Sequence, residues 1–226
     1  QENIEKAAKE SGRSGEDVIL LAATKTVDAE TINFAIDNGI KCIGENRVQE
    51  LLDKYDAINK DKVDIHFIGT LQTNKVKYII DKVDMIHSVD RVSLVDEIER
   101  QAAKRNIIMP VLAEINIGKE ETKSGILPEQ AEEFCAYISE KPHIKLCGLM
   151  AIPPKSENFG DNRKYFCEMA KIFIDISSKN VDNSNMDVLS LGMSDDYADA
   201  ADCGSTLVRV GSAIFGKREY PIKNQE

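Results

Sequence analysis

The sequence has few of the residues that build metal centres and none of the spacings that arrange them. Only three histidines occur among 226 residues, and neither an H-E-x-x-H nor a C-x-x-C spacing is present. Because metal ligands usually come in such pairs, the sequence predicts no metal site. The five cysteines are odd in number, widely spaced and mostly set in apolar runs. They indicate neither a disulfide framework nor a zinc site, but small buried hydrophobes.

Long apolar segments and an excess of positive charge are also lacking. No apolar stretch approaches the roughly 20 residues that span a bilayer, and residues 1–17 suit a polar amphipathic helix better than a signal peptide. The formal net charge is -10, whereas nucleic acids and anionic membranes attract basic surfaces. We therefore expect a cytoplasmic protein with neither class of partner.

The glycine-rich phosphate motifs of dinucleotide-binding and P-loop proteins are missing as well. What the chain does have is a regular alternation of apolar strand-like runs and helical periodicity, which is typical of a parallel sheet with crossover helices. The expected strands lie at 18–25, 41–46, 64–70, 84–89, 109–117, 146–152, 186–193 and in 206–216. The helices expected between them lie at 28–39, 47–58, 72–81, 91–106, 128–141, 162–179 and 194–204. Eight strands in a chain of this length predict a single (β/α)8 TIM barrel over residues 1–226, preceded by an extra N-terminal helix.

A lysine ends the first strand-like run, VILLAATK. Lys25 falls on the same face of that strand as Leu21 and the small Ala23, because side chains alternate between the two faces of a strand. If this face is the barrel interior, Lys25 enters the barrel mouth, where a desolvated amine can form a Schiff base with a carbonyl compound. The alternative is an ion pair of Lys25 with Glu45 or Glu114.

Polar residues at the other end of the sequence predict an anion site. Arg209 is followed by Gly211 and Ser212 at the expected start of a short helix, and backbone N–H groups with a hydroxyl there can bind phosphate. Ser194 either caps the helix that follows it or contacts the same anion. A lysine and an anion site together suit a phosphorylated carbonyl compound, either pyridoxal 5′-phosphate or the sugar phosphate of a Schiff-base aldolase.

A succession of longer motifs distinguishes between these two compounds. In order, they are AATKT, IGENRVQE, HFIGTLQTNK, SVDR, NIGKEETKSG, GLMAIP and LGMSDDYADAADCGSTLVRVGSAIFG. This succession, from about Asn3 to Gly216, resembles the pyridoxal phosphate homeostasis protein family, also called the proline synthetase co-transcribed protein family. That family is related to the N-terminal barrel of alanine racemase, the fold-type III pyridoxal phosphate (PLP) proteins.

The resemblance implies a role for each matching residue. Lys25 would carry PLP as a Schiff base, and Arg209 would face the pyridine nitrogen. Ser194, Gly211 and Ser212 would bind the phosphate. Asn46 and Met193 would line the ring. His66, Asn74 and Lys75 belong to the third motif and are expected at the pocket rim, although Asn74 and Lys75 could instead cap the following helix.

The resemblance also predicts binding rather than turnover. A permanently charged guanidinium opposite the pyridine nitrogen disfavours its protonation and so restrains carbanion chemistry. Racemisation needs a second base, which in alanine racemase comes from a C-terminal β-domain, and we expect no such domain after residues 216–226 here. We therefore expect a non-catalytic, monomeric PLP carrier acting in vitamin B6 and amino-acid homeostasis, with PLP-dependent apo-enzymes as candidate partners. The alternative is a weak amino-acid racemase, while Arg209 makes the aldolase the least favoured hypothesis.

Overall fold

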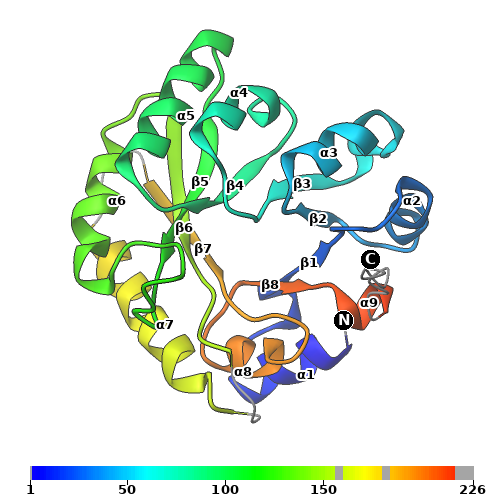
Figure 1. Ribbon diagram of the computed structural model, residues 1–226. Coiled ribbons are helices and arrows are strands. Elements are labelled where there is room, and N and C mark those ends of the chain that lie inside the picture. The colour runs from blue at the N-terminus through cyan, green and yellow to red at the C-terminus, as the bar shows by residue number, and fades with distance from the viewer. Residues whose placement is uncertain (1, 156–159, 180–183, 217–226) are drawn as a thin grey trace, which may run out of the picture.

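Eight parallel strands close into a barrel in the computed structural model, which describes residues 2–155, 160–179 and 184–216. Each strand pairs with its neighbour in chain order and β8 returns to β1, so the ring in Figure 1 has no free sheet edge. The strands are β1 Ile19–Ala23, β2 Cys42–Glu45, β3 Asp64–Phe67, β4 Met85–Val89, β5 Met109–Ile115, β6 Ile144–Ala151, β7 Ser184–Ser190 and β8 Leu207–Val210. The predicted barrel is confirmed.

Helices surround the barrel on its outside (Figure 1). They are α1 Glu2–Glu10, α2 Ala29–Asp37, α3 Val48–Lys54, α4 Val76–Ile79, α5 Val92–Arg105, α6 Ala131–Ser139, α7 Arg163–Ser177, α8 Tyr197–Asp202 and α9 Ser212–Phe215. Short 3-10 helices lie at Gly15–Asp17, Tyr55–Ala57, Lys60–Lys62, Thr73–Lys75 and Pro128–Gln130. The extra helix α1 packs against α8, and its Ile4 and Ala8 join a small core with Val208 and Val210 of β8.

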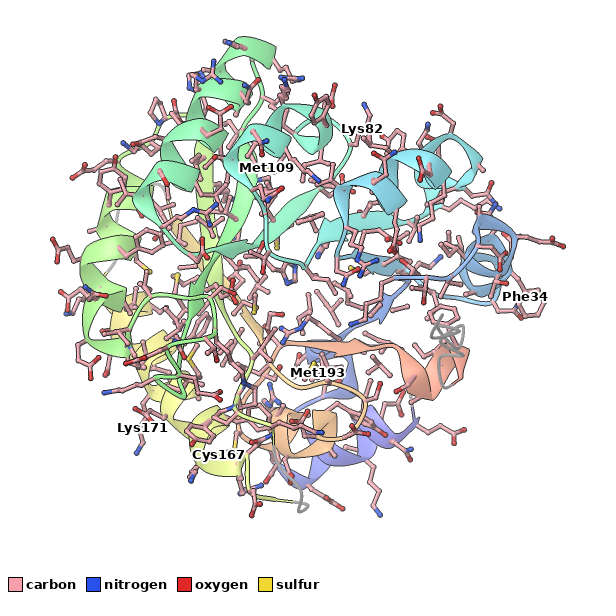
Figure 2. All side chains as sticks on the ribbon, viewed as in Figure 1. Phe34, Lys82, Met109, Cys167, Lys171 and Met193 are labelled. Atoms are coloured by element: carbon pink, nitrogen blue, oxygen red, sulfur yellow. A yellow bond between two sulfur atoms is a disulfide. The ribbon has the colours of Figure 1, made fainter. Side chains whose placement is uncertain are left out.

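The main core lies between the strands and the helices. On α2, Ile32 and Ile36 are four residues apart and therefore share one helix face, which is buried. Phe34 lies on the opposite face with 70% of its surface exposed, and Figure 2 shows it at the outer edge of the molecule. Each fully buried Ile or Leu of this layer contributes about 2 kcal/mol through the hydrophobic effect. The barrel interior holds smaller apolar clusters, such as Leu21, Cys42 and Leu207.

Most of the strands have other bounds than predicted, and two of these differences affect residues of the expected site. β1 ends at Ala23, so Lys25 lies in the loop after the strand. β7 covers 184–190 rather than 186–193, because Gly192 adopts a φ of +85°, which turns the chain. A side chain on Gly192 would also collide with α8, since its Cβ would lie 2.6 Å from the Cβ of Ala200. α8 is accordingly shorter than expected, at Tyr197–Asp202.

The cysteine prediction is wrong for one pair. Cys167 on α7 and Cys203 after α8 form a disulfide, with 5.1 Å between their Cα atoms. Their 36-residue separation hides this contact in the sequence, and it arises because α7 packs against α8. Cys42, Cys135 and Cys147 are free thiols and buried, as expected of small hydrophobes.

None of the helices formed by the described residues is both long and apolar enough to cross a bilayer. No group of three or more His, Cys, Asp or Glu side chains within the described ranges is placed to hold a metal ion.

Candidate functional site

A cavity of about 530 Å³ opens where the strands end. It is lined by residues at or just after the C-terminal ends of seven strands, the edge where barrels of this kind place their active sites. The lining residues are Ala23, Lys25, Asn46, Arg47, Ile68, Gly69, Thr70, Glu114, Ser124, Ile152, Met193, Ser194, Asp195, Arg209, Gly211 and Ser212. All seven residues for which the resemblance implies a contact with PLP are among them, and Figure 2 shows Met193 toward the middle of the ring.

The loop that presents Lys25 is held by α3. The Lys54 ammonium donates to the carbonyl oxygens of Thr24 (2.9 Å) and Val27 (3.0 Å), one on each side of Lys25. Thr26 adopts a φ of +66°, a left-handed conformation that a β-branched residue rarely takes, and its N–H donates to Glu50 Oε2 at 3.1 Å. The surrounding contacts therefore fix the backbone at Lys25.

Glu45 anchors this same loop. Its carboxylate is fully buried, accepts a hydrogen bond from the Thr24 hydroxyl and lies 2.7 Å from the Lys54 ammonium. Burial raises the pKa of Glu45, while the hydrogen bonds from Lys54 and Thr24 oppose that change. Of the two ion-pair partners considered for Lys25, Glu45 thus pairs with Lys54.

The anion end of the cavity joins the chain after β7 to the chain after β8. Ser194 Oγ accepts a hydrogen bond from the Gly211 N–H at 3.1 Å, which leaves the hydroxyl hydrogen of Ser194 for donation to an anion. Asp196, and not Ser194, is the N-cap residue of α8, so the capping interpretation of Ser194 is wrong. The Asp196 carboxylate already accepts from the Met193 N–H (2.7 Å) and from the Asn162 amide (2.9 Å).

Gly211 lies close to the end of β1. A Cβ at this position would lie 3.3 Å from the carbonyl oxygen of Ala23, which is tighter than most Cβ contacts, and 3.4 Å from the Ala23 Cβ. The close approach brings the start of α9 against the end of β1. The anion end and the loop of Lys25 are therefore neighbours in the same cavity.

Arg209 supplies a buried cation in the cavity wall. Its Nη1 donates to the carbonyl oxygen (2.8 Å) and the hydroxyl of Ser190, and its Nη2 donates to the carbonyl oxygen of Ala151 at 2.9 Å. Burial lowers the pKa of Arg209 to about 10, so the guanidinium remains charged at neutral pH. Three hydrogen bonds fix the plane of this group.

Two buried oxygen atoms in the wall lack hydrogen-bond partners among the described residues. One is Asn46 Oδ1 and the other is Glu114 Oε2, while Glu114 Oε1 accepts from the Ser124 hydroxyl at 3.1 Å. Burial, opposed by the Ser124 hydrogen bond, raises the pKa of Glu114 to about 7. Unpaired polar atoms in a cavity are what a ligand with polar groups would satisfy.

The cavity thus fits a phosphorylated aldehyde such as PLP. It combines a lysine, a serine hydroxyl at the β7–β8 end, a fixed guanidinium and unsatisfied acceptors within one cavity. A Schiff-base lysine and an anion site are the two groups that this class of compound needs.

The three residues expected at the pocket rim are not among those that line the cavity. His66 is on β3 and points into the barrel interior, where its Nδ1 lies 2.9 Å from His87 Nε2. Asn74 and Lys75 lie in the 3-10 helix after β3 and are not among the residues that line the cavity. Neither makes a side-chain cap bond at the helix that follows.

Sequence reasoning did not assign a role in the site to Arg47, Ser124, Ile152 or Asp195. All four line the cavity from loops that follow strands. The signal that could have found them is their place in the motifs IGENRVQE, NIGKEETKSG, GLMAIP and LGMSDD, each of which spans or directly follows the C-terminal end of a strand.

Comparison with known proteins places this geometry in a family. The family model "Alanine racemase, N-terminal domain" matches residues 1–219. A pyridoxal phosphate homeostasis protein of Aquifex aeolicus is 46% identical over 219 residues, covering 97% of this chain and 95% of the relative. One from Escherichia coli K12 is 38% identical over 226 residues, covering 99% and 95%.

Several solved structures have a similar fold. A protein of unknown function from Bifidobacterium adolescentis has a TM-score of 0.91 at 36% identity, covering 95% of this chain and 90% of that one. PipY of Synechococcus elongatus with PLP bound has a TM-score of 0.81 at 27% identity, covering 95% and 100%. The fold also matches the alanine racemase of Clostridium difficile, at a TM-score of 0.72 and 16% identity, over 98% of this chain and 56% of the enzyme. The chain therefore belongs to the pyridoxal phosphate homeostasis protein family, whose barrel is that of the alanine racemase N-terminal domain.

Proposed function

We propose that this protein binds PLP and acts as a non-catalytic carrier in PLP and amino-acid homeostasis. The observation that carries the proposal is the meeting of Lys25, Arg209 and Ser194 in one cavity. Relatives at 38–46% identity are named pyridoxal phosphate homeostasis proteins, and the PipY structure holds PLP. The proposal places the protein in the cytoplasm as a monomer, with PLP-dependent apo-enzymes as the recipients of the cofactor.

In this proposal, different residues of the cavity bind different parts of PLP. Lys25 carries the cofactor through a Schiff base, Arg209 faces the pyridine nitrogen, and the Ser194 hydroxyl with the Gly211–Ser212 backbone binds the phosphate. Asn46 and Met193 lie against the ring. When bound, PLP supplies an electrophilic carbon and an electron-withdrawing ring. Arg209 limits the second property, because its fixed positive charge disfavours a proton on the pyridine nitrogen.

The experiment that tests the proposal is a titration of the purified protein with PLP, followed by visible absorbance. The wild type is expected to become yellow, and Lys25→Ala is expected to lose this absorbance because the amine that forms the Schiff base is gone. Lys123→Ala is the control, since Lys123 donates to the Pro153 carbonyl and does not line the cavity. A wild-type protein that stays colourless with PLP would rule the proposal out.

A second candidate function, a weak amino-acid racemase, is favoured by Glu114. An acid–base catalyst works best when its pKa is near the working pH, and the pKa of Glu114 is raised to about 7 in the cavity wall. Incubation of the PLP-loaded protein with L-alanine, followed by chiral chromatography, separates the two functions. If D-alanine forms, and if its formation is lost in both Lys25→Ala and Glu114→Gln, the racemase function is correct and the carrier function is wrong.

A further inference from the structure

A chain of hydrogen bonds crosses the barrel interior beneath the cavity. It begins at Arg209 on β8, passes through Ser190 on β7 and His87 on β4, and reaches His66 on β3. The distances are 3.2 Å from Ser190 Oγ to His87 Nδ1 and 2.9 Å from His87 Nε2 to His66 Nδ1. Ser190 and His87 are fully buried, and His66 is 7% exposed.

The direction of each bond follows from the donors available. A guanidinium can only donate, so Ser190 Oγ accepts from Arg209. Among the described residues, the hydrogen bonds of this hydroxyl run only to Arg209 and His87, so its own hydrogen points at His87 Nδ1. A neutral His87 then carries its proton on Nε2 and donates it to His66 Nδ1.

Both histidines are held in the neutral form. Burial lowers the pKa of His87 far below its ordinary value, and the charges of His66 and Arg209 act in the same direction. Burial lowers the pKa of His66 to about 4. Protonation of His87 would add a donor at Nδ1, which would turn the Ser190 bond around and place a second cation beside Arg209.

We infer that His87 is a positioning residue for Arg209, acting through Ser190. By accepting the hydroxyl hydrogen of Ser190, His87 keeps the lone pairs of that oxygen directed at the guanidinium. His66 in turn fixes the ring of His87 by accepting its Nε2–H. The inference rests on the proposed function in one respect, namely that Arg209 faces the pyridine nitrogen of bound PLP.

The first test uses PLP-free protein and nuclear magnetic resonance. The ¹⁵N shifts of His87 and His66 are expected to show neutral rings protonated on Nε2 between pH 6 and 8. The side-chain N–H groups of Arg209 are expected to exchange about tenfold faster with water in His87→Leu than in the wild type, because the Ser190 hydroxyl is then free to turn away from the guanidinium. A His87 ring protonated on Nδ1, or unchanged exchange at Arg209, overturns the inference.

The second test uses the PLP-loaded protein. His87→Leu and Ser190→Ala are expected to shift the absorbance maximum and to weaken PLP binding about tenfold, while His87→Gln, which keeps an acceptor, restores both. Competition by inorganic phosphate is expected to be unchanged, because Ser194 and Gly211 are untouched. Wild-type absorbance and affinity in both His87→Leu and Ser190→Ala overturn the inference.

Matched controls separate positioning from general damage to the core. His143→Leu removes a histidine that bonds Glu99 on the outside of the barrel, and Ser139→Ala removes a buried serine of α6. Neither is expected to change absorbance or affinity. If the wild type binds no PLP, the proposed function fails, and the Arg209 exchange measurement alone decides the inference. If a variant does not fold, the ring protonation of the wild type still decides it.

Discussion

At the scale of single residues, the site has two buried ionisable side chains in its wall, Glu114 and Arg209. Arg209 keeps its charge because three hydrogen bonds to Ser190 and Ala151 oxygens replace the water it loses. Among the described residues, the Glu114 carboxylate accepts a hydrogen bond only from the Ser124 hydroxyl, and its Oε2 has no partner. The protonation of the Glu114 carboxyl group therefore depends on what else occupies the cavity beside it.

The raised pKa of Glu114 makes the free energy of unfolding depend on pH. The folded pKa of about 7 lies above the ordinary value of 4.5, so the unfolded chain releases this proton at a lower pH than the folded chain. Glu114 therefore destabilises the fold increasingly as pH rises from about 4.5 to above 7, by about 3 kcal/mol in all. Glu114→Gln is expected to be more stable than the wild type by up to this amount at pH 8 and equally stable at pH 4.

Urea unfolding at pH 4, 6 and 8 measures the difference. Gln keeps an acceptor for the Ser124 hydroxyl, so only the charge is removed. Glu121→Gln serves as the control, because Glu121 is exposed in the β5–α6 loop that also carries Ser124, and it is expected to show no such trend. A Glu114→Gln difference that does not grow with pH contradicts this account.

At the scale of elements, the β1–α2 loop depends on α3. Lys54 reaches from the last turn of α3 to two carbonyl groups of that loop and to the buried Glu45 carboxylate. The loop itself is strained at Thr26. The position of Lys25 is thus determined by residues 20 to 30 positions further along the chain.

Lys54→Met is expected to lower the free energy of unfolding by about 3 kcal/mol or more, because it leaves the buried Glu45 charge without its partner. Glu45→Gln combined with Lys54→Met is expected to recover part of this loss. Lys62→Met is the control, because Lys62 and Asp37 form an exposed pair with side-chain exposures of 61% and 55%, and such pairs contribute less than about 1 kcal/mol. Equal effects of Lys54→Met and Lys62→Met in urea unfolding would refute the role of Lys54.

The disulfide between α7 and the end of α8 is a second element-level feature. Closing a loop of 36 residues is expected to stabilise the fold by about 3 to 4 kcal/mol in the chain-entropy account. Reductant should lower the urea midpoint of the wild type and leave Cys167→Ser unaffected. Thiol titration of the denatured, unreduced protein should detect the three free cysteines, Cys42, Cys135 and Cys147, and detection of five would contradict the pairing.

At the scale of the whole molecule, the closed barrel brings all parts of the cavity to one end. Residues from the first loop to the start of α9 line the same space, so a ligand there contacts segments almost 190 positions apart. Such a ligand stabilises the entire fold, because the unfolded chain cannot assemble the site.

PLP at a free concentration 100 times its dissociation constant is accordingly expected to stabilise the protein by about 2.7 kcal/mol. For a chain of this size that corresponds to a rise of about 5 to 10 °C in Tm. Differential scanning calorimetry with and without PLP measures it, and Lys25→Ala at the same PLP concentration is expected to show a smaller rise. An equal rise in both proteins would mean that PLP binds without Lys25.

Local patterns in the amino-acid sequence were enough to predict the barrel and to group a set of residues near its mouth. Strand periodicity and helix periodicity are local properties, so eight repeated units could be read from short windows, and strand ends could be placed to within a few residues. Since parallel strands end on one side, residues such as Lys25, Asn46 and Arg209 could be assigned to one site before any contact was known.

The pairing of side chains, in contrast, could be known only from the folded chain. The Arg209–Ser190–His87–His66 chain, the Glu45–Lys54 pair and the Cys167–Cys203 disulfide join residues 9 to 103 positions apart. Their meeting depends on barrel closure, strand register and helix packing, which periodicity does not encode. The same reason explains Ser194: its sequence context left a helix cap and an anion contact equally open, and only the approach of β8 to β7 shows its hydroxyl bonded to the Gly211 N–H.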